Sequence, residues 1–350
     1  MRKSTRLLSV IVAGAMLLSM TACGNKTTDS GAAATTAAET KAEDTTAADK
    51  AEDTAAADQA ADGKVFKIGI LQLVQHTALD ASNKGFVQAL DDSGIAYTLD
   101  SQNASGDQST CQTIASKLVN DGDDLILAIA TPAAQAVAGA TSEIPILITA
   151  ITDPAASDLV ASNEAPGGNV SGTSDLTPVK EQIDLLQQLL PEAETIGVLY
   201  CSAESNSEIQ ANMAREAIEA KGMKAVDYTV SNSNEIQTVV TSMVGKVDAI
   251  YAPTDNVVAA GMATVAMVAN DNKIPIICGE EGMVNAGGLA TYGIDYYELG
   301  YLAGQQAVRI LIEGEDISKM AIEYLPLEKC KLSVNEETAE ILGIDVSGLQ

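Results

Sequence analysis

Residues 248–256 read DAIYAPTDN, an apolar run that ends in a proline and three small polar residues. A helical run, 257–270, begins directly after it. In open parallel α/β sheets, ligands lie outside the carboxyl ends of the strands, where the next helices begin. The stretch therefore predicts the edge of a parallel sheet with a ligand position outside it.

The same pattern occurs earlier, in residues 124–132, which read DLILAIATP. Three more pairs of similar segments follow in the same order, at separations of 120 to 130 residues. They are IGIL from 68 with IGVL from 196, IPILI from 144 with IPIIC from 274, and GGNVSG from 167 with GGLATY from 287. Four ordered pairs predict two tandem copies of a βαβ unit.

The chain after residue 64 is too long for one compact core and suits two lobes. We expect residues 65–177 and 294–320 to form the first lobe, and residues 178–293 and 321–350 the second. A chain that returns in this way crosses between the lobes several times, and such crossings act as a hinge. The predicted fold class is α/β, with two Rossmann-like lobes whose parallel sheets are joined by a multi-strand hinge.

Alternating apolar runs and helical stripes place the elements within each lobe. The predicted strands of the first lobe are 67–73, 96–99, 125–130, 146–149 and 170–172, and its helices are 79–93, 109–120 and 133–140. The predicted strands of the second lobe are 196–200, 224–230, 249–251, 276–278 and 288–292. Thr177 is expected to cap a helix that starts at Pro178, and a further helix is expected over 296–312, before a tail with a strand and a short helix.

The first residues predict export. Arg2, Lys3 and Arg6 precede an apolar run, 7–20, which is shorter than the roughly 20 residues that a membrane span needs. We interpret residues 1–22 as a signal peptide. Cys23 resembles the bacterial lipobox cysteine, whose thiol is diacylated, and two acyl chains hold a protein firmly on a membrane surface. A plain secretory signal with an incidental cysteine is the alternative.

Residues 24–64 contain 14 Ala and 8 Thr among 41 residues, with scattered acids and no aromatic residue. Such a segment buries too little apolar surface to offset its ordering entropy, so we expect a disordered tether over 23–64. The whole chain carries a net charge of −28 at pH 7, which would repel nucleic acid.

Cysteine and histidine usage bears on metal binding. Cys111, Cys201, Cys278 and Cys330 lack metal-type spacing and the chain has one histidine, so we expect no metal site. The predicted strands of Cys201 and Cys278 lie two apart, about 9.5 Å at sheet spacing, which is beyond disulfide reach. Buried free thiols are therefore expected.

Polar residues follow the predicted strands on the side where the cleft is expected. The candidate ligand-binding residues are His76, Thr131, Asp153, Asp175, Asn206, Thr254, Asp255, Asn256, Glu281 and Asp295, with Gln75 and Glu280 beside them. Acids dominate this set, and carboxylates hold a cationic group through charge-assisted hydrogen bonds. The alternative for each residue is a helix cap or a turn.

After removal of the signal, the remaining arginines are Arg215 and Arg309, both in helical runs. We therefore expect no arginine to bind a ligand carboxylate. Helix starts after Thr131 and Thr254 could take that role. An α-amino acid fits this combination of acids and amide donors. The absence of Trp weakens a sugar-binding interpretation, since sugars usually stack on aromatic rings. Tyrosines at 200, 251 and 292 could line an apolar pocket, although packing is the more usual role of strand tyrosines.

Catalytic motifs are missing. His76 is the sole histidine, and the chain contains neither a G-x-S-x-G elbow nor a G-x-x-x-x-G-K phosphate loop. Glu280 and Glu281 are adjacent in one loop, where two acids seldom face each other across a substrate. We therefore expect neither an enzyme nor a cofactor.

Several motifs together resemble those of one family. They are HTALD from 76, ATPAAQ from 130, TDP from 152, PGGNVSG from 166, VDAIYAPTDN from 247, EEG from 280 and GIDYYELG from 293. This set is similar to the substrate-binding lipoproteins of ABC importers of the tryptophan/tyrosine type, with Thr77 where the family often has proline. The resemblance implies a type I periplasmic-binding-protein fold and, from several members, an aromatic amino acid as ligand.

It also implies a non-enzymatic, monomeric receptor that is lipid-anchored on the outer face of the cytoplasmic membrane and serves an ABC permease and its ATPase. The alternatives are a sensor that reports the same ligand to a signalling system, and a nucleoside or sugar receptor of the same fold. An extracellular hydrolase is the remaining rival.

Overall fold

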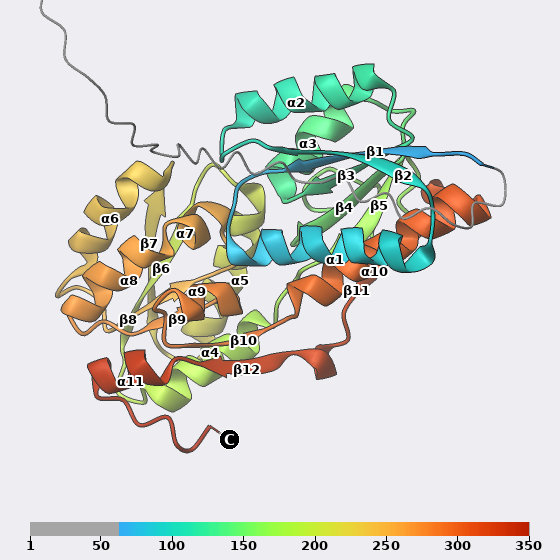
Figure 1. Cartoon of the computed structure of the whole chain (residues 1–350). Coiled ribbons are helices and arrows are strands. Elements are labelled where there is room, and N and C mark those ends of the chain that lie inside the picture. Colours follow the sequence, from blue (N-terminus) through green and yellow to red (C-terminus); the bar gives the residue numbers. More distant parts are fainter. Residues whose placement is uncertain (1–62, 350) are drawn as a thin grey trace, which may run out of the picture. The chain divides into compact units, whose positions relative to one another are not determined.

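The computed structural model describes residues 63–349, which form two six-stranded sheets with helices between the strands (Figure 1). The expected signal peptide, Cys23 and nearly all of the tether lie outside the described residues. None of the described helices combines the length and the apolar character that crossing a membrane would require.

The first sheet has the order β11-β5-β4-β3-β1-β2, with every neighbouring pair parallel. Its elements, in chain order, are β1 (Phe66–Gln72), α1 (Thr77–Ser93), β2 (Tyr97–Asn103), α2 (Gln108–Asp121), β3 (Leu125–Ile129), α3 (Thr131–Ala140), β4 (Ile146–Ile151) and β5 (Val170–Ser174). The chain later returns with α10 (Tyr296–Val308), a π-helical turn (Arg309–Glu313) and β11 (Glu323–Tyr324).

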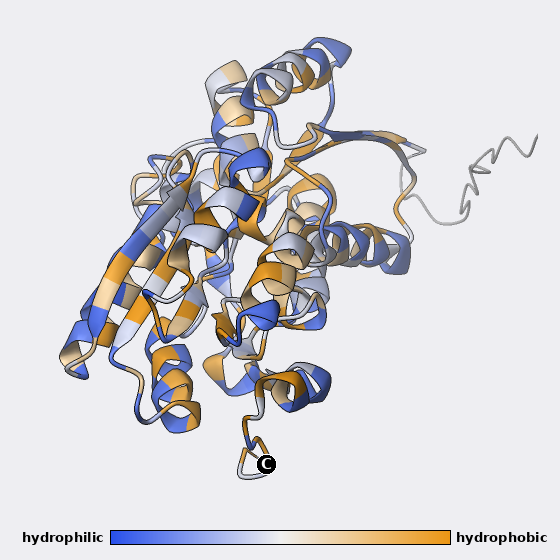
Figure 2. Cartoon of the chain, turned by 90° about the vertical axis from the view of Figure 1, so that its left-hand side faces the viewer, coloured by the Kyte–Doolittle hydropathy of each residue, from blue (hydrophilic) through white to orange (hydrophobic). Residues whose placement is uncertain are grey.

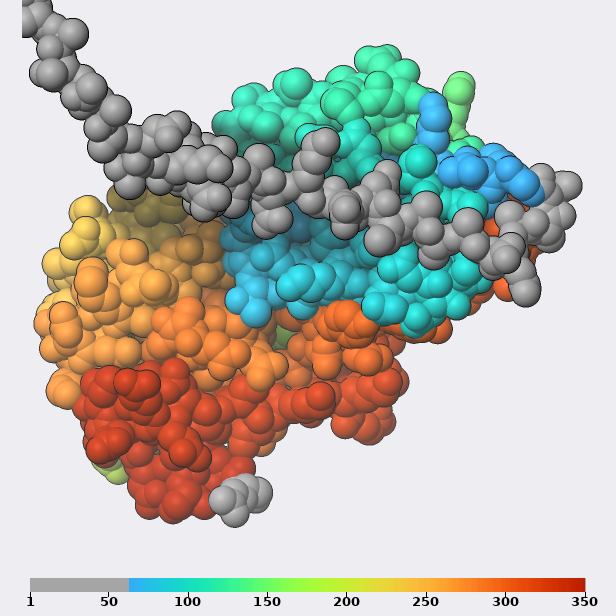
Figure 3. Space-filling model, viewed as in Figure 1, coloured from blue at the N-terminus to red at the C-terminus, as the bar shows by residue number. Residues whose placement is uncertain are grey.

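The second sheet has the order β12-β10-β9-β8-β6-β7, in which only the β10 and β12 pair is antiparallel. Its elements are α4 (Val179–Leu189), β6 (Thr195–Cys201), α5 (Ser205–Ala220), β7 (Lys224–Val230), α6 (Ile236–Met243), β8 (Ala249–Ala252), α7 (Asn256–Ala260), α8 (Met262–Asp271), β9 (Ile276–Cys278), α9 (Glu281–Asn285), β10 (Ala290–Gly293), β12 (Lys331–Val334) and α11 (Glu336–Leu342). In Figure 3 the red residues of this last segment lie against the orange ones before them.

Both sheets use the same strand order within their repeat: second, first, third, fourth, fifth. The predicted α/β class with two lobes is confirmed, and the sheets are mostly parallel. A matching aspartate secures each repeat. Asp124 accepts a hydrogen bond from the backbone N–H of Lys67 at 2.8 Å, and Asp248 accepts one from Thr195 at 2.8 Å. Each aspartate thus ties the start of the third strand to the start of the first.

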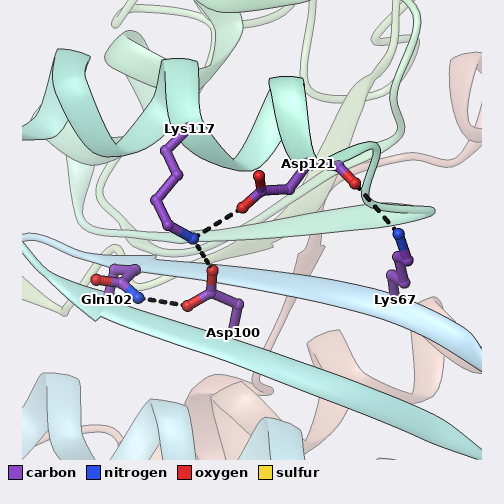
Figure 4. A network of polar contacts seen from close by, with 5 residues as sticks. All are labelled: Lys67, Asp100, Gln102, Lys117 and Asp121. Atoms are coloured by element: carbon purple, nitrogen blue, oxygen red, sulfur yellow. Dashed lines mark hydrogen bonds and ion pairs between the residues drawn. The ribbon is translucent and has the colours of Figure 1, made fainter.

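The strands at the centre of both sheets are buried on both faces because helices cover both sides. β3, β4 and β8 are fully buried along their length. The outer helices instead carry hydrophobic residues inward and hydrophilic residues outward, and Figure 2 shows the two kinds interleaved around them. α2 is held to the edge strand β2 by Lys117, which contacts Asp100 and lies 2.8 Å from Asp121 (Figure 4). These charges are solvent-exposed, so they contribute little to stability.

Some predicted boundaries were wrong. β2 runs on to Asn103, because its polar end still pairs with β1 along the full register. The predicted helix 257–270 is broken at Gly261, which packs against Ile236 and separates α7 from α8. Thr177 is not a cap, since Pro178 occupies the cap position and α4 begins one residue later.

The chain passes between the lobes three times, after β5, after β10 and after β11. β11 pairs with β5 through Glu323 and Tyr324, so the chain remains in the first lobe past the boundary expected at residue 320. These three connections are the crossings at which the sequence predicts a hinge.

Helices α1 and α10 pack with their backbones in contact, as Figure 1 shows for the two ribbons. A Cβ on Gly300 would lie 1.9 Å from the carbonyl oxygen of Ser82, and one on Gly85 would lie 2.0 Å from that of Tyr297. Glycine is therefore required at this crossing. This contact packs α1, which precedes all three crossovers, against α10, which follows the second crossover.

We predict that Gly300→Ala lowers the free energy of unfolding by about 1 to 3 kcal/mol or more, because the helices must separate to admit the methyl group. Chemical denaturation measures the change. Gly139→Ala is the matched control, since Gly139 is exposed on α3 and nothing lies within 4 Å of its added Cβ. That variant should be as stable as the native chain or more stable by about 0.5 to 1 kcal/mol. Equal stability of the two variants would contradict the proposed crowding.

Candidate functional site

A buried cavity lies where the strand ends of the two lobes face each other. From the first lobe and its crossovers it is lined by His76, Leu79, Ala150, Asp175 and Tyr296, and from the second by Asn206, Thr254, Asp255, Asn256, Ala259 and Glu280. Its free volume is about 10 Å³, close to the minimum that one water molecule needs. Ala150 has a φ of 57°, a left-handed backbone conformation that is uncommon for a non-glycine residue.

Direct hydrogen bonds join the lobes around this cavity. The Nε2 atom of His76 lies 3.2 Å from Asn256 Oδ1. Beside it, the Gln210 amide donates to Thr152 Oγ1 at 3.0 Å. Both contacts connect residues of different lobes, so they join the two lobes across the cavity.

Two carboxyl groups lie together on the second lobe. Glu204 Oε2 accepts a hydrogen bond from the Asn256 amide at 2.7 Å, which orients Asn256 toward His76. Asp255 caps α7 by accepting from Val258 N at 2.7 Å, and its other oxygen accepts from Cys201 N at 2.5 Å. Burial raises the pKa of both groups, and the charge of Asp255 raises that of Glu204 further.

Glu280 and Asp175 complete the acidic lining. Glu280 caps α9 by accepting from Met283 N at 2.8 Å, and burial raises its pKa to about 7. Asp175 accepts from the Tyr296 hydroxyl at 2.8 Å through Oδ2, and burial raises its pKa to about 6. Neither carboxyl has a cationic partner, since the residues that line the cavity include no lysine or arginine.

Two buried oxygen acceptors at the cavity have no hydrogen-bond partner among the described residues. They are Asp175 Oδ1 and Asn206 Oδ1, on residues that are 5% and 4% exposed. An unsatisfied buried acceptor costs about 1 to 3 kcal/mol. A ligand with several N–H donors, and in particular a cationic one, would satisfy both acceptors from opposite lobes.

Six of the ten candidate residues line the cavity: His76, Asp175, Asn206, Thr254, Asp255 and Asn256. The other four lie outside it. Thr131 is buried at the start of α3, and Asp153 closes a turn by accepting from Ala155 N at 3.1 Å. Glu281 is exposed on α9, and Asp295 caps α10 and lies 3.7 Å from Lys331 Nζ.

Other residues at the site are not among the ten candidates that the sequence predicts. Glu280, which the sequence placed beside the ten candidates, lines the cavity, and neither Tyr296 nor Glu204 is among the predicted residues. Glu204 directly precedes α5 at the same sheet edge as Asn206, a position that could have signalled it. The strand tyrosines do not line this cavity, and Tyr251 instead donates to Gln182 Oε1 at 2.7 Å in the core. The four cysteines within the described residues are free; Cys111, Cys201 and Cys278 are buried as expected, whereas Cys330 is half-buried.

Comparisons with known proteins show what this chain is similar to. The family model described as "ABC transporter substrate binding protein" matches residues 67–348. The chain is 42% identical to the tyrosine-binding protein of Clostridioides difficile (strain R20291), over 98% of this chain and 94% of that protein.

Two solved structures are similar along the described part. One is the ABC domain of Streptococcus pneumoniae in complex with L-Trp, with 38% identity, a TM-score of 0.78, and coverage of 81% of this chain and 96% of that one. The other is the ligand-free, open structure of a Clostridium difficile substrate-binding protein with adhesive properties, with 46% identity, a TM-score of 0.62, and coverage of 80% and 96%.

Glu204 gives a pH-dependent prediction. Because its pKa is raised, the folded chain keeps this proton at pH values where the unfolded chain has lost it. The free energy of unfolding therefore falls as pH rises above the ordinary value of 4.5. We predict that Glu204→Gln removes this pH-dependent loss. Between pH 5 and pH 8, the free energy of unfolding of the variant should therefore rise by about 1 to 3 kcal/mol relative to that of the native chain.

Denaturant unfolding at both pH values measures this difference. Glu208→Gln, an exposed substitution on the first turn of α5, is the control and should show no such gain. If the free energies of unfolding of the native chain and of Glu204→Gln differ by the same amount at pH 5 and at pH 8, Glu204 is ionised in the folded chain.

Proposed function

Since this chain belongs to the family of ABC transporter substrate-binding proteins, we propose that it is a receptor for an apolar, most suitably aromatic, L-amino acid, which it binds between its lobes and delivers to a permease and its ATPase. This role is non-catalytic. The observation that carries the choice of ligand is the pair of unpartnered acceptors on Asp175 and Asn206, set among carboxyls with no cationic side chain.

The ammonium of an amino acid has three donors and a positive charge, which suit these acceptors. Apolar side chains of Leu79, Ala150 and Ala259 line the same cavity and offer contacts for an apolar ligand side chain. The similar proteins support this class of ligand, because one is named for tyrosine and the other contains L-Trp.

Binding requires the lobes to separate. A free volume of about 10 Å³ cannot admit an amino acid, so we propose that the hinge opens for entry and that the ligand replaces part of the contact between the lobes. The higher TM-score with the L-Trp complex than with the ligand-free open structure, 0.78 against 0.62, supports a closed arrangement here.

We propose that the receptor is anchored to the extracytoplasmic face of the cell membrane by lipid that is attached to Cys23. Support comes from the basic start, the short apolar run and the small residues before Cys23. The tether would let the lobes contact a permease while the lipid stays in the membrane.

Tryptophan is the probe of choice, because the chain contains no Trp and red-edge excitation then excites the ligand alone. We predict a blue shift of its emission on binding, and displacement by L-tyrosine and L-phenylalanine. Asp175→Asn should weaken binding by about 2 to 5 kcal/mol, more than tenfold in Kd, because a buried partner of the ammonium loses its charge.

Asp158→Asn is the matched control, since Asp158 is exposed and its φ of 59° suits asparagine. It should bind as the native chain does. If none of the amino acids binds while a nucleoside or a sugar raises the melting temperature, the proposed ammonium recognition is wrong.

We also predict that Cys23→Ala releases the protein from the membrane fraction, since lipid attachment needs the thiol. Detergent phase partitioning of cells that express each form measures this. A native protein that partitions into the aqueous phase would contradict lipid anchoring and leave the proposed ligand unaffected.

A further inference from the structure

Asp175 is fixed by a residue from another part of the chain. It directly follows β5, and its backbone N–H donates to the carbonyl oxygen of Ile151 at 3.0 Å. Its side chain accepts from the Tyr296 hydroxyl at 2.8 Å. Asp175 lies at the first crossover and Tyr296 at the end of the second, so this hydrogen bond joins two of the three connections between the lobes.

The two oxygens of Asp175 differ because of Tyr296. Oδ2 accepts the hydrogen bond of the tyrosine hydroxyl, whereas Oδ1 has no hydrogen-bond partner within residues 63–349, and Asp175 and Tyr296 both line the cavity. A carboxylate held through one oxygen cannot rotate freely, so the other oxygen keeps a fixed direction. Tyr296 is itself 6% exposed and has little room to move.

Tyr296 is in turn held by the first lobe. It is the first residue of α10, which contacts α1 through Gly300 and Gly85. α1 begins directly after His76, another lining residue. His76 and Tyr296 therefore belong to one rigid pair of helices, and Asp175 is attached to that pair.

We propose that Tyr296 is a positioning residue for ligand recognition: it holds Asp175 with one oxygen free for the ligand ammonium and links the first two crossovers on the side of the first lobe. This role rests on the proposed amino-acid ligand. Binding of the ammonium to Asp175 would thereby act on the segments about which the lobes move.

The test is Tyr296→Phe, which removes only the hydroxyl. With L-tyrosine as the probe at pH 7.5, calorimetry should show affinity reduced by about tenfold or more, since hydrogen bonds to charged groups are among the stronger ones. The double variant with Asp175→Asn should bind no more weakly than Asp175→Asn alone, because both changes remove the same arrangement.

Tyr301→Phe is the matched control. Tyr301 lies on the same helix and donates to Asp92 Oδ2 at 3.0 Å, also between α10 and α1, but on the exposed surface. It should bind L-tyrosine as the native chain does.

A pH profile separates positioning from general damage. Burial raises the pKa of Asp175 to about 6, and the Tyr296 hydrogen bond partly offsets that rise. Affinity should fall as pH drops through this value, and Tyr296→Phe should move the fall to higher pH. The other titrating groups at the cavity, His76, Glu204, Asp255 and Glu280, are unchanged in both proteins, so the shift reports on Asp175.

The role is overturned if Tyr296→Phe keeps both the affinity and the pH profile of the native chain. If that variant does not fold, 3-fluorotyrosine placed at 296 keeps the hydroxyl and supplies a fluorine resonance. A resonance that is unmoved by saturating L-tyrosine then overturns the role. Failure of the native chain to bind L-tyrosine or L-tryptophan would instead refute the proposed ligand.

Discussion

Four carboxyl groups buried without a cationic side chain are the constraint on which the site depends. The carboxyl oxygens of Glu204, Asp255 and Glu280 accept hydrogen bonds from backbone or amide donors. Burial removes these groups from water and so raises their pKa values. In the part of the chain that the structure describes, only one of the Asp175 carboxyl oxygens has a hydrogen-bond partner. The cavity is thus most stable when something from outside supplies positive charge or N–H donors, and an ammonium group supplies both.

The duplicated fold places these groups in one cavity. Each parallel sheet directs its strand ends and helix starts toward one edge, and the two edges face each other. His76 and Asn256 then come within hydrogen-bonding distance although they are 180 residues apart. The crossovers end at the same edge, which is why Asp175 and Tyr296 belong both to the crossovers and to the cavity.

Much of this could be predicted from the sequence, because strand order follows from repeated apolar runs, and Asp255 and Asn256 directly follow one of them. Asp153 and Asp295 show the limit, since an acid at the start of a turn or helix has the same pattern whether it binds a ligand or caps the backbone. Tyr296 could not be found in this way. Its importance comes from the residue that its hydroxyl meets 121 positions away, and no local pattern contains that contact.

The return of α10 and β11 to the first lobe also determines the order in which the chain can fold. Leu299, Ala303 and Ile322 belong to the core of the first lobe, yet the whole second sheet except β12 precedes them in the chain. During synthesis from the N-terminus, the first lobe therefore cannot complete its core until about residue 324 has been made. Contacts of such high sequence separation slow folding, which leaves the chain unfolded for longer after translation begins, the condition in which a polypeptide can still be threaded through a narrow translocation pore.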